Sequence, residues 1–270
     1  MAQRVGDFLL RRLHRWGVRR VFGYPGDGIN GIIGAFGRQP EKEAVAFIQA
    51  RHEEEAAFMA SGHAKLTGEV GVCLATSGPG AIHLLNGLYD AKLDRKPVVA
   101  IVGQSVRMAL GGHFQQEVDL LSLFKDVASD FVQVCTTPKQ ARHLIDRALR
   151  IAKSQRTVTA IIFPNDVQEE EVSEPGDAHG SIHTGTDFSQ ALVVPKMQDL
   201  QRAADILNKG EKVAMLIGAG AWKRLTRSWL WRKTCRPASP RRFWPRRCCR
   251  TIWLFPPARS GFWAPRHPGS

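Results

Sequence analysis

The chain has 270 residues and a formal net charge of +13 at pH 7. Its 43% hydrophobic and 23% charged residues are typical of a globular protein and exclude a disordered or collagen-like chain. This length allows one large domain or two smaller ones with a sizeable core. No apolar run approaches the roughly 18 residues of a membrane-spanning helix, so we expect no integral membrane segment.

The sequence also predicts neither a signal peptide nor disulfide bonds. The arginines near the N-terminus are not followed by the apolar segment of a signal peptide. The five cysteines form no Cys-x-x-Cys pair and no framework spacing, which indicates a reducing compartment. We therefore expect a cytoplasmic protein.

The positive charge is confined to one end of the sequence. Residues 222–270 contain eleven Arg, two Lys and no Asp or Glu, whereas the other 25 basic and all 25 acidic residues lie in 1–221. The first 221 residues are therefore neutral, and their charge gives no reason to expect nucleic acid as a partner.

Helical and strand patterns alternate along residues 1–166. The apolar runs 70–76 and 97–102 are nearly continuous, which is typical of strands buried on both faces of a parallel sheet. We expect further strands over 20–22, 44–49 and 157–163, and helices over 5–16, 53–67, 79–93 and 138–151. This alternation predicts an α/β fold with a doubly wound parallel sheet.

The composition changes after this first domain. Residues 167–195 are rich in Asp and Glu, contain no Lys or Arg, and predict a linker. A helix beyond residue 195 and a strand over 212–217 lead into Gly218-Ala219-Gly220. We expect residues 196–221 to be the beginning of a second, Rossmann-like domain.

Two glycine-rich turns and one acidic helix start are the candidate functional features. Gly23-Tyr24-Pro25-Gly26 and Ser77-Gly78-Pro79-Gly80 both follow predicted strands, where ligands of open α/β sheets bind. Glu53 opens a helix within Glu53-Glu54-Glu55. Taken singly, such turns are also ordinary tight corners, and such acids are also ordinary solvated charge at the positive end of a helix.

The order of these segments resembles the pyrimidine-binding domain of thiamine-diphosphate-dependent enzymes, of the pyruvate oxidase and acetohydroxyacid synthase family. Arg51-His52-Glu53-Glu54 lies between the two turns, as in that family. The run from His83 to Asp90 is most similar to the branch of pyruvate oxidases and quinone-linked pyruvate dehydrogenases, since acetohydroxyacid synthases usually have Asn where His83 stands. Phe114-Gln115-Gln116-Glu117 resembles the Phe-Gln-Glu segment of the family, with Gln in the Phe place. The resemblance covers roughly residues 3–166 and weakly 195–221.

The resemblance implies a role for each matching residue. Glu53 is the catalytic carboxyl group that shares a proton with N1′ of the aminopyrimidine, which leads to activation of the thiazolium toward a 2-keto acid. The cofactor-binding residues that it implies are Pro25, Thr76, Gly78, Pro79, Gly80 and His83, and Gln116 faces the substrate. His83 reads equally well as a packed core histidine.

The implied reaction is conversion of pyruvate or a related 2-keto acid, with an oxidase favoured over an acetolactate synthase. The family binds thiamine diphosphate with Mg²⁺ between subunits, which implies a homodimer or homotetramer. Its Mg²⁺–diphosphate motif lies in a C-terminal domain, so the magnesium site is absent from this chain, and we expect Asp27 in Gly26-Asp27-Gly28 to cap the next helix. Gly218-Ala219-Gly220 is an incomplete dinucleotide turn, which leaves FAD as a possible third cofactor. We expect the chain alone to be inactive.

Residues 222–270 form an irregular basic segment. They hold six of the seven Trp, three of the five Cys and seven of the 15 Pro, without helical or strand periodicity. A non-catalytic, nucleic-acid-binding protein that acts through this segment is the alternative of another class. We instead hypothesise a frameshift after about residue 221, because GC-rich DNA read in a wrong frame yields this composition. Resequencing of the gene tests this hypothesis, since clean reads in the present frame exclude a sequencing error.

Overall fold

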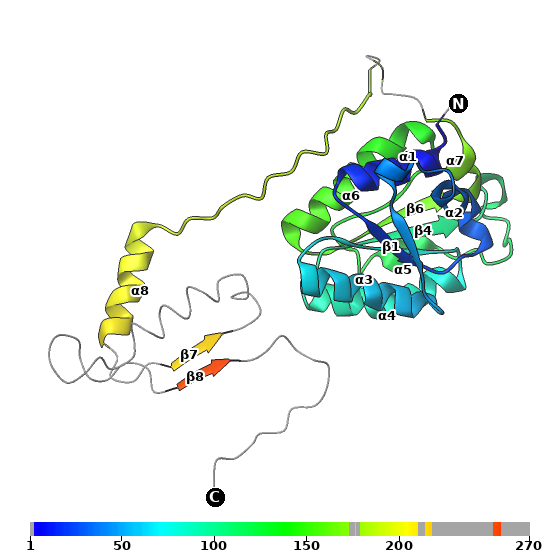
Figure 1. The fold of residues 1–270 in the computed structure, drawn as a ribbon. Coiled ribbons are helices and arrows are strands. Elements are labelled where there is room, and N and C mark those ends of the chain that lie inside the picture. The colour runs from blue at the N-terminus through cyan, green and yellow to red at the C-terminus, as the bar shows by residue number, and fades with distance from the viewer. Residues whose placement is uncertain (1–2, 173–175, 177–178, 210–213, 218–250, 255–270) are drawn as a thin grey trace, which may run out of the picture. The chain divides into compact units, whose positions relative to one another are not determined.

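The computed structural model describes residues 3–172, 176, 179–209, 214–217 and 251–254 (Figure 1). The chain divides into two compact units, residues 1–190 and residues 191–270. Within the described ranges, none of the helices has the length and apolar character that crossing a bilayer requires.

The first unit is built on a six-stranded sheet in the order β2-β1-β3-β4-β6-β5. Every neighbouring pair of strands in it is parallel, which confirms the predicted doubly wound α/β fold. The strands are β1 (Arg20–Gly23), β2 (Ala46–Gln49), β3 (Gly71–Ala75), β4 (Val98–Gln104), β5 (Val132–Val134) and β6 (Val158–Pro164).

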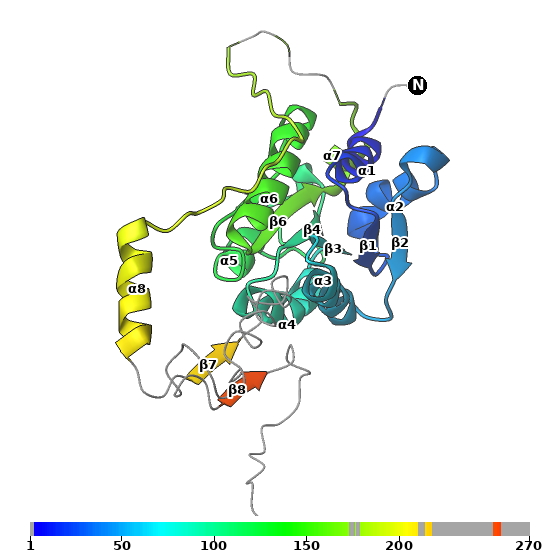
Figure 2. The same cartoon turned by 60° about the vertical axis from the view of Figure 1, so that its left-hand side comes forward.

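Helices cover both faces of this sheet (Figures 1 and 2). One buried cluster joins the sheet to α1 (Val5–Arg15), α2 (Asn30–Phe36), α6 (Ala141–Gln155) and α7 (Asn165–Glu169). A second cluster joins the opposite face to α3 (Glu53–Thr67), α4 (Pro79–Leu93) and α5 (Leu120–Phe124). Short 3₁₀ turns occur at η1 (Asp27–Ile29), η2 (Glu41–Glu43), η3 (Arg107–Ala109) and η4 (Pro138–Gln140).

Local sequence signals set the ends of the main helices. Gly68 ends α3 in the left-handed region at φ 76°, where glycine carries no steric penalty. Pro79 is the first residue of α4, where its missing N–H costs no hydrogen bond. Thr137 and Pro138 begin η4, which continues into α6, as predicted for this helix start.

Two features of the first unit differ from the predicted elements. The short strand β5 and the helix α5 were not predicted, because three to five residues are too few for a periodic pattern. The expectation that Asp27 caps a helix is wrong, because Asp27 is itself the first residue of η1 and Gly26 precedes it without a side-chain cap.

The first residues of the predicted linker are part of the folded first unit. Val167 and Gln168 in α7 are fully buried. The Gln168 side chain donates to the carbonyl of Gly28 at 2.8 Å and accepts from the N–H of Ile32 at 3.3 Å. With its further bond to the carbonyl of Phe163, the buried Gln168 amide satisfies three backbone groups, so the folded domain extends into the acidic segment predicted to be a linker.

The second unit contains α8 (Met197–Lys209) and a parallel pair of strands, β7 (Ala214–Ile217) and β8 (Thr251–Leu254). The helix and β7 lie where the sequence predicts the start of a second domain. Within residues 222–270, the structure describes only β8, whose β-branched and aromatic residue types favour a strand. The rest of that segment, and Gly218-Ala219-Gly220, lie outside the described residues.

Candidate functional site

The candidate site lies where β1 and β3 end. The chain passes from β1 outward to β2, and then returns to the other side of β1 to form β3 and β4. The helices that follow β1 and β3 consequently pack on opposite faces, α2 on one and α4 on the other. Such a switch point leaves a crevice at the carboxyl ends of the strands, where open α/β sheets bind ligands.

The turn after β1 is fixed to the turn after β3 through Thr76. The hydroxyl oxygen of Thr76 accepts a hydrogen bond from the N–H of Gly28 at 2.9 Å. A Cβ at residue 26 would lie 2.7 Å from the Thr76 Cβ, so only glycine fits against this side chain. Pro25, which is partly buried, directly precedes this contact.

The turn after β3 requires glycine at residue 78, both for its backbone conformation and for lack of space. Gly78 has φ 57°, and a Cβ at this residue would lie 2.7 Å from the carbonyl oxygen of Gln116. The tight turn and the segment that carries Gln116 are therefore in direct backbone contact. Pro79 and Gly80 then begin α4.

Glu53 is the buried member of the three acids that open α3. Its residue exposure is 8%, whereas Glu54 is partly buried and Glu55 exposed. Glu54 bonds instead to the side-chain amide of Asn86 at 2.6 Å, and Glu55 bonds to the N–H of Arg51 at 3.2 Å. Glu53 is thus buried against the start of α4, while its two neighbours contact other residues.

Two histidines lie against the Glu53 carboxylate. The Nδ1 atom of His83 is 3.1 Å from Glu53 Oε2. His52 is the N-cap of α3, where its Nδ1 accepts from the N–H of Glu54 at 3.2 Å, and its ring centroid lies 4.3 Å from that of His83. His83 is 43% exposed in its side chain, so the alternative of a packed core histidine is not what the structure shows.

Gly80 borders the same carboxylate from the other side. A Cβ at residue 80 would lie 3.1 Å from Glu53 Oε1 and 2.7 Å from the Thr76 Cγ2. The absence of a side chain here lets the backbone of α4 lie directly against the carboxylate and the threonine. Glu53, Thr76, Gly78, Gly80 and His83, which are separated by up to 30 residues in the sequence, are thereby brought to one place.

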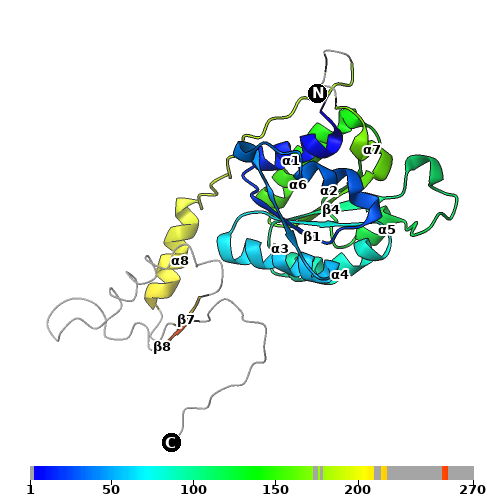
Figure 3. The same cartoon turned by 45° about the vertical axis from the view of Figure 1, so that its right-hand side comes forward.

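Gln116 belongs to a loop that one carboxylate holds in shape. Glu117 accepts hydrogen bonds from the N–H groups of Gly111 at 2.6 Å and Phe114 at 3.0 Å, and these bonds lower the pKa of Glu117. Gln116 itself has φ 63° and is exposed. The segment between β4 and α5 stands out beside α5 (Figure 3). The carbonyl oxygen, Cα and Cβ of Gln116 all lie against the Cβ position of Gly78.

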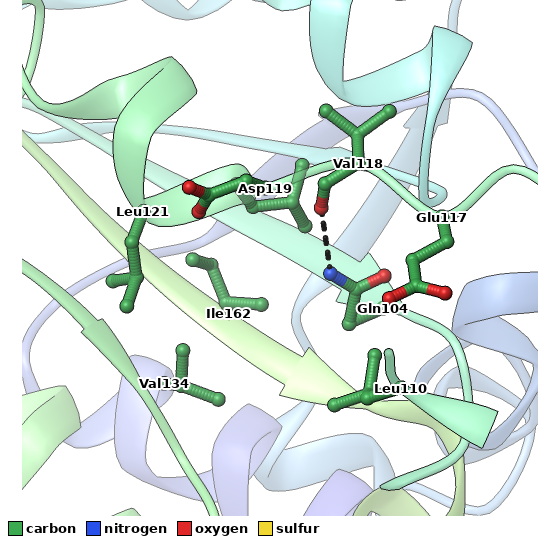
Figure 4. A pocket seen from close by; sticks show the side chains of 9 residues that line it. Gln104, Leu110, Glu117, Val118, Asp119, Leu121, Val134 and Ile162 are labelled. Atoms are coloured by element: carbon green, nitrogen blue, oxygen red, sulfur yellow. Dashed lines mark hydrogen bonds between the residues drawn. The ribbon is translucent and has the colours of Figure 1, made fainter. Parts of the chain in front are cut away.

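A cavity of about 280 Å³, not predicted from the sequence, opens near the carboxyl ends of β4 and β5 (Figure 4). In its wall, the Gln104 side chain donates to the carbonyl of Val118 at 3.0 Å. Its lining is mainly apolar but includes the acidic residues Glu117 and Asp119, and Glu117 is the last residue of the Phe114-Gln115-Gln116-Glu117 segment. The residues that line it are Gln104, Leu110, Glu117, Val118, Asp119, Leu120, Leu121, Val134 and Ile162.

His52 is the residue of the site to which the sequence assigns no role. Histidine is not among the preferred N-cap residues, so the sequence does not predict that His52 caps α3. Its contact with His83 depends on α3 and α4 lying side by side.

Glu53 is thus a buried carboxyl group at the switch point of an open α/β sheet, where sheets of this class bind their ligands. Residues 3–123 match the family described as "Thiamine pyrophosphate enzyme, N-terminal TPP binding domain". Residues 3–123 therefore belong to the thiamine pyrophosphate enzyme family as its N-terminal domain, which confirms the resemblance seen in the sequence.

The curated relatives of this chain include enzymes of two kinds. It is 38% identical over 220 residues to the "Putative thiamine pyrophosphate-containing protein YdaP" of Bacillus subtilis, which covers 81% of this chain and 37% of that protein. It is 34% identical to a pyruvate oxidase of Lactiplantibacillus plantarum (81% of this chain, 35% of that protein). It is 33% identical to an acetolactate synthase of Arthrospira platensis (79% and 36%). The chain thus spans little more than a third of the length of these relatives.

Proposed function

We propose that this chain holds the aminopyrimidine of thiamine diphosphate against Glu53. The observation that carries the proposal is the buried carboxylate of Glu53, with His83 on one side and the backbone of Gly80 close against it on the other. The donor chemistry fits, because a carboxyl group shielded from water can share a proton with a neutral ring nitrogen. A side chain at residue 80 would clash with Thr76 and press against the Glu53 carboxylate, which would displace the group that meets the ring.

Each residue of the site then has one task. Glu53 holds a proton at N1′ of the aminopyrimidine and returns it. Gly78, Pro79 and Gly80 let the ring approach the backbone, while Thr76 fixes the two turns and His83 forms one wall. Pro25 and Gln116 lie toward the thiazolium and the substrate. When bound, thiamine diphosphate supplies the electron sink needed to cleave the bond beside the keto group of a 2-keto acid.

We further propose the activity of the whole protein. This activity is the oxidative conversion of pyruvate or a related 2-keto acid. His83 supports it, because acetolactate synthases usually carry Asn at this position. Acetolactate synthesis is the second candidate, because relatives with that name match at similar identity. We also propose that the whole protein binds FAD, forms a homodimer or homotetramer, and is cytoplasmic.

The whole reaction needs more than the site around Glu53. Thiamine diphosphate also requires Mg²⁺ and ligands for its two phosphates, which the family carries in another domain. Among the described residues, the one group of three or more candidate metal ligands is that of His52, Glu53 and His83, at the pyrimidine end of the proposed site. We therefore propose that this chain alone does not turn over 2-keto acids.

Saturation-transfer NMR with thiamine tests the binding proposal. We expect the pyrimidine protons to receive more saturation from the protein than the thiazolium protons. Glu53→Gln should weaken binding at least about tenfold, because a hydrogen bond to a charged group is lost. Glu54→Gln is the matched control, since it changes the adjacent carboxylate, which bonds to Asn86.

Equal effects of the two substitutions, or stronger transfer to the thiazolium, would contradict the proposal. The same titration with thiamine diphosphate and Mg²⁺ should show no submicromolar affinity. Such an affinity would overturn the inactivity of the isolated chain.

A further inference from the structure

His52, Glu53 and His83 form a cluster of three metal-ligating side chains. One ligand atom of each lies within 4.8 Å of the others. His52 and Glu53 are consecutive, but His83 comes from α4, so the cluster exists only because α3 and α4 start at the same edge of the sheet. Two imidazoles with one carboxylate and an open fourth position are the ligand set of catalytic zinc sites.

The distances around Glu53 Oε2 are close to those of a bound ion. Ligand atoms around tetrahedral zinc lie about 3.3 Å apart, because each bond is about 2.0–2.1 Å long. His83 Nδ1 is 3.1 Å from Glu53 Oε2, and His52 Nε2 is 4.0 Å from the same oxygen. Both imidazole side chains are nearly half exposed, so a small rotation of His52 closes the longer gap.

We propose that this cluster binds a divalent transition-metal ion of the zinc class through His52 Nε2, Glu53 Oε2 and His83 Nδ1. The fourth position is open to water. Glutamates 53, 54 and 55 in the first turn of α3 offset the positive end of the helix, which would otherwise repel a cation.

The protons of the two rings must be rearranged on binding. In the free chain, His52 Nδ1 accepts from the N–H of Glu54, so the proton of the neutral ring is on Nε2. Coordination through Nε2 moves that proton to Nδ1 and breaks the bond to Glu54. His83 Nδ1 likewise has to be free of its proton, which a neutral ring carries on Nε2 instead. Two tautomer changes therefore accompany metal binding, without net release of a proton from neutral rings.

A metal ion at this position occupies the oxygen atoms that the proposed function gives to the aminopyrimidine. The ion and the cofactor ring would then exclude each other, so metal binding would inhibit loading of the enzyme. This consequence rests on the proposed function, whereas the metal site itself does not.

Titration of the full chain with Co²⁺ tests the site, because tetrahedral cobalt absorbs visible light. We expect His52→Asn and His83→Asn each to weaken the absorbing complex at least tenfold. Asparagine at residue 52 is a preferred N-cap, so this variant keeps the start of α3 folded. His63→Asn is the matched control, because His63 also lies beside a carboxylate, 3.5 Å from Glu69, but without a third ligand.

Absence of visible absorption, or absorption that persists in both variants, would overturn the site. An intense thiolate charge-transfer band would likewise overturn it, because it would assign the cobalt to cysteines. Zn²⁺ added to the thiamine NMR sample separates the two proposals. Loss of thiamine binding with Zn²⁺ in the wild-type chain but not in His52→Asn supports mutual exclusion, and unchanged binding overturns it. Failure of thiamine to bind at all overturns the proposed function and leaves the cobalt result standing.

Discussion

On one face of the sheet, α1 packs through several leucines, whereas on the other face α3 buries mainly alanine and α4 buries alanine, glycine and two leucines. Leu9, Leu10, Leu13 and Phe163 are among the largest fully buried side chains of the first cluster. The second cluster contains Ala56, Ala57, Ala60, Ala64, Ala81 and Ala91. Small residues let backbones approach, so on this face backbone contacts determine where the helices start.

The glycines of the second face show how close this approach is. A Cβ at Gly71 would lie 2.1 Å from the carbonyl oxygen of Ala60, and one at Gly87 would lie 2.6 Å from the N–H nitrogen of Phe58. The starts of α3 and α4 carry Glu53 and the Gly78–Gly80 turn. The close packing of the second face therefore positions residues of the candidate site.

The first face is instead held by a buried polar hub at Asp146. Its carboxylate accepts from Arg12 at 2.6 and 2.8 Å and from the Trp16 indole at 2.7 Å, and also from the Thr184 hydroxyl. Phe188 lies against Trp16, with ring centroids 6.4 Å apart. These contacts fix residues 184–188, within the predicted linker, onto α1 and α6.

Asp146→Ala should produce the largest loss of stability in this comparison. Removal of one partner leaves the guanidinium of Arg12 buried without its charge partner, which costs about 3–5 kcal/mol of unfolding free energy. Urea denaturation followed by tryptophan fluorescence measures this loss. Asp7→Ala is the control, since it breaks a more exposed pair with Arg38 and should cost under about 1 kcal/mol. Similar losses for the two variants would show that the hub is not stabilising.

Gly71→Ala should have the next largest effect, on the opposite face. The added methyl group must displace the backbone of α3, and such overpacking costs about 1–3 kcal/mol. Thermal unfolding of the variant measures it. Gly62→Ala in α3 is the matched control, because no atom lies within 4 Å of its Cβ position, and it should stabilise the helix by about 0.5–1 kcal/mol. A neutral Gly71→Ala would contradict the backbone-contact interpretation of this face.

The smallest expected effect on stability comes from the bonds of Lys65 and Ser61 in α3 to Asp90 in α4, which we call the α3–α4 link. Its contribution depends on pH. Burial raises the pKa of Asp90, but hydrogen bonds from Lys65 and Ser61 outweigh it and hold this pKa below its usual value of 3.8. The link therefore contributes fully above that value, and its contribution is lost as the pH falls through the lowered pKa. Because both side chains are partly exposed, we expect under about 1 kcal/mol.

Unfolding free energies of the wild type and Asp90→Asn at several pH values test this link. The difference between the two proteins should shrink as the pH falls below 3.8. A difference that stays constant, or that grows in acid, would contradict the assignment.

The sequence by itself determined the α/β class, the main strands and the helix starts at Glu53, Pro79 and Pro138. These are local properties, because buried parallel strands form continuous apolar runs and helix starts depend on a few adjacent residues. The resemblance to a family also singled out Glu53, which composition alone could not separate from Glu54 and Glu55.

Only the tertiary structure decided which side chains meet. The burial of Glu53, its contact with His83 and the ring of His52 beside it depend on two helices brought together by distant alanines and glycines. The docking of Thr184 on Asp146 likewise joins residues 38 positions apart. Such pairings carry no periodic signal in the sequence, because each depends on the packing of the whole sheet and its helices.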